Sequence, residues 1–518
     1  MLNGAKTKVY KLLSGFNQMK WSVAGKGILG GLAAGLLAVL YRLGIEYGTG
    51  ISVKIYAYFR IHPIFILPWV IAVIAAGIFI AWLVKLEPMA SGSGIPQVEG
   101  VVLFGLKMKW YTVLAVRFVG GILCAFFGLS LGREGPSIQI GAAGSQAVTK
   151  RLSKSKIEEN YLITGGAAAG LSAAFNAPLS GMVFALEEVH RSFSPLILLS
   201  ATTASLTADL VSKYFFGLKP VLDFTPIPQL PVNLYFWLIP LGIISGFAGS
   251  VMNKSLLGFQ TLYNKLPAFL RPIIALLIAL PCGLFLPLTL GGGQNLIKFA
   301  EGAQTGISML LIYLVVKLLF TSTSFGSGVP GGIFMPILTV GTLTGSIFGI
   351  AAAYFGLPVQ YIPVFAVCAM AGTLASSVKA PVTSILLTAE MAGSLIHLLP
   401  VAVCAFTALL LSDILKIEPI YEALLERFAE KNGSSLHMQE KGGLLEIPVE
   451  LGSEAADRMV SEIEWPKGSL IVGLRRGAKE FVPHGNTKII SGDYLVILSS
   501  EDNEGTIRDS LKSFCRAK

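Results

Sequence analysis

Residues from about 24 to 415 form one long series of apolar stretches, and this pattern constrains the fold more than any other feature. Several stretches are shorter than the roughly 20 residues that a perpendicular membrane helix needs, and Gly or Pro interrupts many of them. Such backbone is tolerated at membrane depth only when it is buried in protein or lines a cavity. The sequence therefore predicts an all-α membrane protein whose tilted, partly broken helices surround a central site. The clearest stretches are 28–47, 64–85, 112–131, 194–212, 234–256, 271–290, 308–321, 333–355 and 382–412.

Charged residues are scarce, and the basic ones lie where membrane topology would place them. Charged residues make up 14% of the chain, against about 25% in soluble domains. The net charge of +10 would suggest a nucleic-acid partner in a soluble protein, but here basic residues fall between apolar stretches, as the positive-inside rule expects. Residues 1–24 are basic and show no cleavable signal. We expect a multi-pass protein of a cell membrane, typical of the bacterial inner membrane, with both termini cytoplasmic and no nucleic-acid partner.

Glycine is abundant, whereas the residue types that bind metals are scattered. The 57 glycines suit helices that approach closely or break, which favours a transporter over a simple receptor. The five cysteines contain no Cys-x-x-Cys pair, and the five histidines show no ligand spacing. We expect neither a metal site nor a cofactor.

An internal repeat runs through the apolar region. Asn-Ala-Pro at 176–178 is followed nine residues after the proline by Glu187, and Lys-Ala-Pro at 379–381 is followed at the same distance by Glu390. Repeats of this kind often enclose a transport site at their interface. We expect a membrane domain over 25–430, with repeats of about 25–220 and 221–430. The sequence leaves open whether the repeats are inverted.

The composition changes after about residue 416, and a small α/β domain is predicted at 444–518, after a linker at 431–443. Its pattern alternates between apolar and polar residues. We expect strands at 445–451 and 494–498, and a hairpin that pairs 469–474 with 480–482. Helices are expected at 452–463 and 503–514.

Three glycine-rich segments interrupt the apolar region, at 92–96 (Gly-Ser-Gly-Ile-Pro), 132–136 (Gly-Arg-Glu-Gly-Pro) and 331–336 (Gly-Gly-Ile-Phe-Met-Pro). Each joins small residues to a proline that can begin a helix, and each precedes an apolar run. Helix N-termini that point inward present free N–H groups, which bind anions. Amides and hydroxyls bind an anion weakly enough for release, whereas a lysine or arginine at the same place would hold it too tightly.

Glu134 is an ionisable residue in one of these breaks. A carboxylate at membrane depth is a functional candidate by default. The alternative is a loop carboxylate at the interface, paired with Arg133. For Ser93 the alternative is a structural turn with no functional role, because Gly-Ser-Gly is a turn in most proteins.

Together these segments resemble the CLC family. The matching residues are 92–96, 132–136, 332–336 and Ala-Phe-Asn-Ala-Pro at 174–178, which leads to Glu187 and Glu188, and the resemblance covers about 25–428. Many members have Ala where this chain has Met335. The resemblance implies the CLC fold of two repeats, and a homodimer with one pathway in each subunit.

The resemblance also implies roles for individual residues. Ser93 and Tyr421 would offer hydroxyls to a chloride ion, and the backbone amides of Ile333 and Phe334 would complete the site. Glu134 would be the external gate, and Glu188 the internal proton acceptor. From the residues alone, Tyr421 could equally be an interfacial aromatic, and Glu188 a helix-end carboxylate paired with His190 or Arg191. Supporting residues would be Gly92, Gly94, Pro96, Glu99, Arg117, Arg133, Gly135, Pro136 and Glu187, with Glu99 and Arg117 forming a buried charge pair.

The presence of both Glu134 and Glu188 resembles the family's antiporters, since its channels lack the internal glutamate. We therefore expect a chloride/proton antiporter. The alternative is a passive, voltage- or pH-gated chloride channel of the same fold. Ser93 resembles chloride or nitrate handlers more than fluoride exporters. An intramembrane enzyme is disfavoured because the adjacent Glu187 and Glu188 would point to different helix faces. A potassium transporter would need filter loops such as TVGYG, and none occurs.

The tail resembles the TrkA-C (RCK-C) lobe of potassium-transporter regulatory domains. The resemblance rests on 447–449 (Ile-Pro-Val), 468–470 (Gly-Ser-Leu), 482–487 and 491–495. It implies a dimerising regulatory module that could take a small-molecule or ion ligand. The alternative is a passive assembly domain.

Overall fold

Breaks between helices determine the arrangement of most of this chain, and these breaks occur at proline and glycine residues. The computed structural model describes residues 2–222, 227–301, 305–431, 443–450, 452–476, 479–499, 510–511 and 514–515. The chain divides into two compact units, Met1–Lys431 and Asn432–Lys518. The first unit is helical, and the second contains a small sheet.

The first unit consists of helices of very different lengths. Those in the first half of this unit are α1 (Leu2–Ile61), α2 (Ile66–Leu86), α3 (Ile95–Leu103), α4 (Trp110–Phe126), α5 (Glu134–Thr149), α6 (Lys156–Phe175), α7 (Pro178–Phe184) and α8 (Pro195–Phe216). Those that follow are α9 (Leu238–Asn264), α10 (Leu270–Phe285), α11 (Gln294–Glu301), α12 (Ile307–Gly326), α13 (Phe334–Ala353), α14 (Ile362–Val378), α15 (Pro381–Met391), α16 (Leu398–Ile414) and α17 (Ile420–Lys431).

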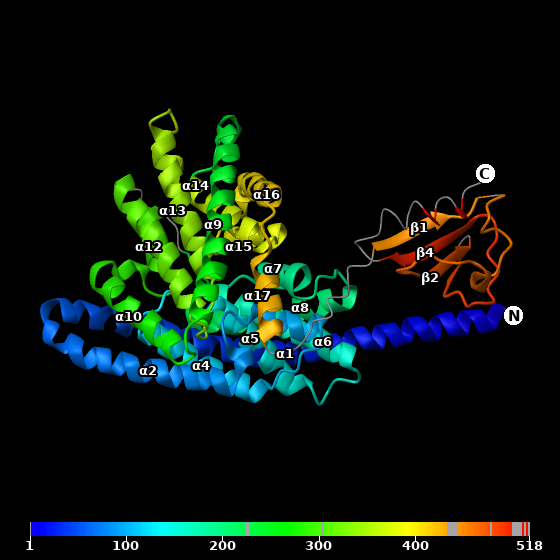
Figure 1. Ribbon diagram of the computed structural model, residues 1–518, viewed down its shortest axis with the longest axis horizontal. Helices are drawn as coiled ribbons and strands as arrows, with labels where there is room; N and C mark the ends of the chain where they lie inside the picture. Colours follow the sequence, from blue (N-terminus) through cyan, green and yellow to red (C-terminus); the bar gives the residue numbers. More distant parts are fainter. Residues whose placement is uncertain are drawn as a thin grey trace. The chain divides into compact units, whose positions relative to one another are not determined.

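Eight helical stretches within the described residues are long and apolar enough to cross a membrane. In Figure 1 the green and yellow helices α9, α12, α13 and α14 run across the direction of the blue helices α1 and α2. The orange helix α17 lies where these two groups meet. The apolar stretch 382–412 is two helices, α15 and α16, because Gly393 turns the chain out of α15 with φ of 69°. The predicted all-α architecture with broken helices is confirmed.

The three glycine-rich segments end at helix starts, as predicted. Helix α3 begins at Ile95, α5 at Glu134 and α13 at Phe334. Each has a proline in its first turn, where the missing N–H costs no hydrogen bond. Gly94 precedes α3 with φ of 95°, a conformation that a side chain would strain.

The repeat seen in the sequence has a structural counterpart. Helices α6 and α14 end at left-handed residues, Asn176 (φ 53°) and Lys379 (φ 63°), and α7 and α15 then begin at a proline. The Glu187 carboxylate accepts hydrogen bonds from the start of α15, and the Glu390 carboxylate accepts them from the start of α7. Such a reciprocal contact implies that a two-fold rotation relates α7 and α15.

The second unit contains a four-stranded antiparallel sheet in the order β1-β4-β2-β3. Its strands are β1 (Gly443–Pro448), β2 (Ser469–Arg476), β3 (Lys479–Phe481) and β4 (Asp493–Ser499). Leu495 on β4 lies between Ile447 on β1 and Leu474 on β2, and all three side chains are buried. The predicted hairpin forms, although β2 continues through Arg476 before the chain turns.

One predicted helix of this unit is wrong. Residues 452–463 contain only a short 3₁₀ turn, Val460–Glu462. The N–H groups of Asp457 and Val460 donate to the carbonyls of Ile489 and Thr487 instead of to their own segment. Asp457 also has φ of 67°, which no α-helix accommodates. The predicted helix at 503–514 lies mostly outside the described residues.

Candidate functional site

Backbone hydrogen bonds bring the three glycine-rich segments together. Gly132 and Gly332 exchange both of their N–H···O bonds, at 2.7 and 2.8 Å. The Gly331 N–H donates to the Gly92 carbonyl at 3.1 Å, and the Gly92 N–H donates to Val329 at 3.2 Å. The starts of α3, α5 and α13, which carry Pro96, Pro136 and Phe334, are thereby linked. Three helix N-termini from distant parts of the sequence lie around one region.

Two buried hydroxyls lie in this region, those of Ser93 and Tyr421. Ser93 is 2% exposed and Tyr421, in the first turn of α17, is fully buried. The Tyr421 hydroxyl faces Ser93. Neither oxygen has a hydrogen-bond partner among the described residues. Gly135 makes room here, because a Cβ on it would lie 2.7 Å from the Ser93 carbonyl oxygen. The structure therefore brings Ser93 and Tyr421 together, and gives Tyr421 a buried place rather than an interfacial one.

Arg117, fully buried on α4, holds the loop that carries Ser93. Its guanidinium donates to the carbonyls of Gly92, at 2.5 Å, and Ser91, at 3.3 Å, and to the Gln139 side chain. The predicted charge pair between Glu99 and Arg117 is wrong. Glu99 instead pairs with Arg191, whose Nη2 lies 2.7 Å from Glu99 Oε1.

Glu134 is the first residue of α5 and is 1% exposed. Its Oε2 has no hydrogen-bond partner among the described residues, and the backbone N–H of Met335 faces the carboxylate. Arg133 makes only a long ion pair with this carboxylate, since Arg133 Nε lies 3.9 Å from Glu134 Oε1. The Arg133 Nη1 atom bonds Glu46 instead. The carboxylate is thus buried at two helix N-termini, not at an interface.

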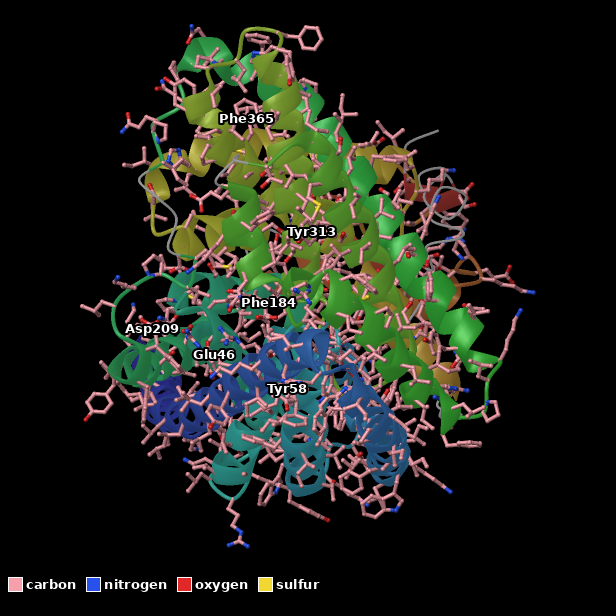
Figure 2. All side chains as sticks on the ribbon, turned by 90° about the vertical axis from the view of Figure 1, so that its left-hand side faces the viewer. Glu46, Tyr58, Phe184, Asp209, Tyr313 and Phe365 are labelled. Carbon is pink, nitrogen blue, oxygen red and sulfur yellow. The ribbon has the colours of Figure 1, made fainter. Side chains whose placement is uncertain are left out.

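Ile333 and Phe334 lie at the start of α13 and are almost fully buried. The Phe334 ring packs against Phe175 and Phe184, with ring centroids 5.9 and 6.3 Å apart. Figure 2 shows Phe184 at the level where the two groups of helices meet. Phe184 is the last residue of α7, so these rings connect the α13 N-terminus to the segment that carries Glu188.

Glu188 lies in a π-helical turn, η3 (Ala185–Val189), and is 4% exposed. Its Oε1 has no hydrogen-bond partner among the described residues. His190 Nδ1 lies 3.0 Å from the Thr164 hydroxyl oxygen, and the described residues include no ion pair between His190 and Glu188. Tyr421 lies within electrostatic range of both Glu188 and Glu134. The structure separates the roles of the two adjacent acids, since Glu187 caps α15 while Glu188 points elsewhere.

A cavity of about 680 Å³ connects the Ser93 loop to basic residues. Its lining includes Gly92 and Ser93, the three cations Arg271, Arg427 and Lys431, and one acid, Glu430. The positive charges would raise the local concentration of anions beside Ser93. Within the residues that the structure describes, no cluster of His, Cys, Asp or Glu could hold a metal ion.

The sequence reasoning missed two charged residues, Glu422 and Glu46, and it considered Arg191 only as a partner of Glu188. Arg191 and Glu422 form an ion pair beside Glu188, and Glu46 joins Arg133 to α1. Glu46 carried a usable signal, because an acid inside an apolar stretch is unusual. Glu422 directly follows Tyr421, but nothing in the sequence links it to Arg191.

Comparison with known proteins gives two matches to family models. The Voltage gated chloride channel model matches residues 76–413, and the TrkA-C domain model matches residues 444–512.

Individual relatives and a solved structure agree with this match. An H(+)/Cl(-) exchange transporter ClcA from Salmonella paratyphi A is 34% identical over 420 residues, covering 77% of this chain and 87% of the relative. The ClcA from Cronobacter sakazakii is 34% identical over 426 residues, covering 80% and 91%. The structure of a slow cyanobacterial Cl-/H+ antiporter superposes with a TM-score of 0.74 at 29% identity, covering 79% of this chain and 99% of that one. The chain therefore belongs to the voltage-gated chloride channel (CLC) family and carries a TrkA-C domain after its membrane region.

Proposed function

We propose that this multi-pass membrane protein exchanges chloride for protons, through a pathway in each subunit of a homodimer. The observation that carries the proposal is the buried Glu134 carboxylate at the joined N-termini of α5 and α13, next to the hydroxyls of Ser93 and Tyr421, which have no hydrogen-bond partner in the described part of the chain. The similar proteins that are named as H(+)/Cl(-) exchange transporters support it.

Chloride would bind between these groups. The hydroxyls of Ser93 and Tyr421 can both donate to an anion, and the backbone N–H groups of Ile333 and Phe334 lie at a helix start, where the partial positive charge is greatest. None of these groups carries a full charge. The site would therefore bind chloride favourably but release it readily.

Glu134 would act as the external gate by competing with chloride. A carboxylate and a chloride ion are both anions, so the same helix N-termini stabilise either one. When Glu134 takes up a proton it loses its charge, and it no longer competes for that position. Chloride can then enter as the protonated side chain moves out, which links each proton to anion movement.

Glu188 would accept protons on the internal side. It is buried, its Oε1 lacks a hydrogen-bond partner among the described residues, and Tyr421 lies in electrostatic range of both glutamates. This second acid favours an antiporter over a passive channel, because proton transfer to Glu134 then has a donor on the opposite side. We place both chain termini in the cytoplasm and assign the TrkA-C unit to regulation, with an ion or small molecule as its ligand.

Purified protein in liposomes tests the proposal. A chloride gradient is imposed while external pH is recorded, so that coupled transport drives protons against their own gradient. Glu134→Gln and Glu188→Gln should each abolish the proton movement, while Glu188→Gln retains chloride flux. Glu426→Gln changes an exposed carboxylate on α17 and serves as the control. Chloride flux without proton movement in the unaltered protein would instead indicate a channel.

A further inference from the structure

One guanidinium links the elements that carry the proposed chloride and proton sites. Arg191 Nη2 lies 2.7 Å from Glu99 Oε1 on α3, and Nη1 bonds Glu422 on α17. The loop before α3 carries Ser93, α17 carries Tyr421, and Arg191 follows the turn that carries Glu188. We propose that Arg191 is a positioning residue that couples chloride occupancy to proton access at Glu188.

The backbone at Arg191 is held in an uncommon conformation. Its φ of 50° places it in the left-handed region, which is sparsely populated by residues other than glycine. It lies two residues after the π-helical turn η3, a rare form of helix that is often found at functional sites. Contacts elsewhere must therefore stabilise this segment, and the two ion pairs of Arg191 provide them.

The charges around Glu188 explain why Arg191 positions this acid without neutralising it. Glu188 lies within electrostatic range of Glu99, Arg191, Glu422 and Glu187. Glu187 is committed to the start of α15. The Arg191 donors are directed to Glu99 and Glu422, and Glu188 Oε1 is left without a hydrogen-bond partner among the described residues. Glu188 thus keeps an oxygen that accepts no hydrogen bond from the described residues, as a proton acceptor requires.

Movement at either of the two proposed chloride-binding side chains, Ser93 or Tyr421, reaches Arg191. Any displacement of Tyr421 moves its neighbour Glu422, and any displacement of the Ser93 loop moves the start of α3, which carries Glu99. Either movement pulls on Arg191 and hence on the turn that holds Glu188.

The test compares proton and chloride fluxes of the full-length protein in liposomes, and it rests on the proposed antiport. In Arg191→Gln we expect chloride flux within about twofold of the unaltered protein, with protons moved per chloride lowered about tenfold, because two charge-assisted contacts are lost. Arg191→Lys should restore the ratio only in part, since an ammonium cannot replace the planar fork. Glu422→Gln, which leaves the Glu99 contact, should lower the ratio less than Arg191→Gln.

Lys379→Gln is the matched control, because Lys379 is also left-handed and pairs with Asp413 at 2.7 Å, but neither residue belongs to α3, η3 or α17. Its flux ratio should be unchanged. An unaltered ratio in both Arg191→Gln and Glu422→Gln would overturn the inference, as would a parallel loss of both fluxes in both variants, which indicates a merely structural role. If the unaltered protein moves chloride without protons, the proposed antiport itself fails, which is a distinguishable result.

Discussion

Removing either of the two reciprocal glutamate caps should destabilise the membrane unit by a similar amount. Glu187 accepts hydrogen bonds from the backbone N–H of Val382, at 3.2 Å, and from the N–H and hydroxyl of Thr383, both at 2.7 Å. Glu390 accepts the equivalent three bonds from Leu179 and Ser180. The perturbation is Glu187→Ala, compared with Glu390→Ala.

The magnitude follows from burial. Val382 is 44% exposed and Leu179 is 45% exposed on the surface of this chain, so the bonds from their N–H groups are left out of the sum. The bonds from buried Thr383 and Ser180 cannot be replaced, and hydrogen bonds to charged groups contribute about 1.5–3 kcal/mol each. Two such bonds at each cap give about 3 kcal/mol or more for an alanine variant. A glutamine variant keeps one acceptor oxygen and should lose about half of that free energy.

The assay is equilibrium unfolding in mixed detergent micelles, monitored by tryptophan fluorescence. Glu426→Ala removes an exposed carboxylate and should leave the free energy of unfolding nearly unchanged. The double variant should lose less than the sum of the two single losses, because both caps belong to the α7–α15 contact. A loss below about 1 kcal/mol in either single variant, or a loss in only one of them, would refute the reasoning.

Two further changes test one cation in each unit. Lys317, fully buried on α12, donates to the carbonyls of Thr289 (3.0 Å) and Gly291 (2.8 Å). Lys317→Met should therefore lower the free energy of unfolding by about 2 kcal/mol, since both carbonyls lose their donor; an equally stable variant in the same micelle assay would contradict this. Arg476 binds the buried Asp493 carboxylate through Nε and Nη2, both at 2.8 Å. Arg476→Ala should cost about 1.5–3 kcal/mol in the sheet, because the buried Asp493 carboxylate loses two charge-assisted hydrogen bonds. Limited proteolysis should then cleave the second unit faster and leave the first intact, and equal cleavage would argue against that role.

Local chemistry made the broken helices predictable. Glycine and proline act on their own neighbourhood, so the segments before Ile95, Glu134 and Phe334 could be identified as helix starts. The helix predicted at 452–463 failed for the opposite reason. Its N–H groups bond carbonyls at 485–489, about 30 residues away, and no local pattern encodes that partner.

The candidate site was predictable as a set of residues but not as a network. Ser93 and Tyr421 lie together as the family resemblance implied, although more than 300 residues separate them. The partner of Glu99 was not predictable, because Arg191 reaches it only from a left-handed turn after a π-helical segment. Hydropathy and motif spacing describe neither feature, and both depend on how α3, α7 and α17 pack.

The crossed caps have a consequence for how a chain of this kind can arise. Each half carries a glutamate, Glu187 or Glu390, whose carboxylate accepts hydrogen bonds from a helix start in the other half. A half-length ancestor would therefore have been incomplete alone but complementary to a second copy of itself. Joining the two copies between α8 and α9 would have fixed their one-to-one ratio without changing the contact, and each copy could then diverge, one keeping Glu188 and the other the α13 N-terminus.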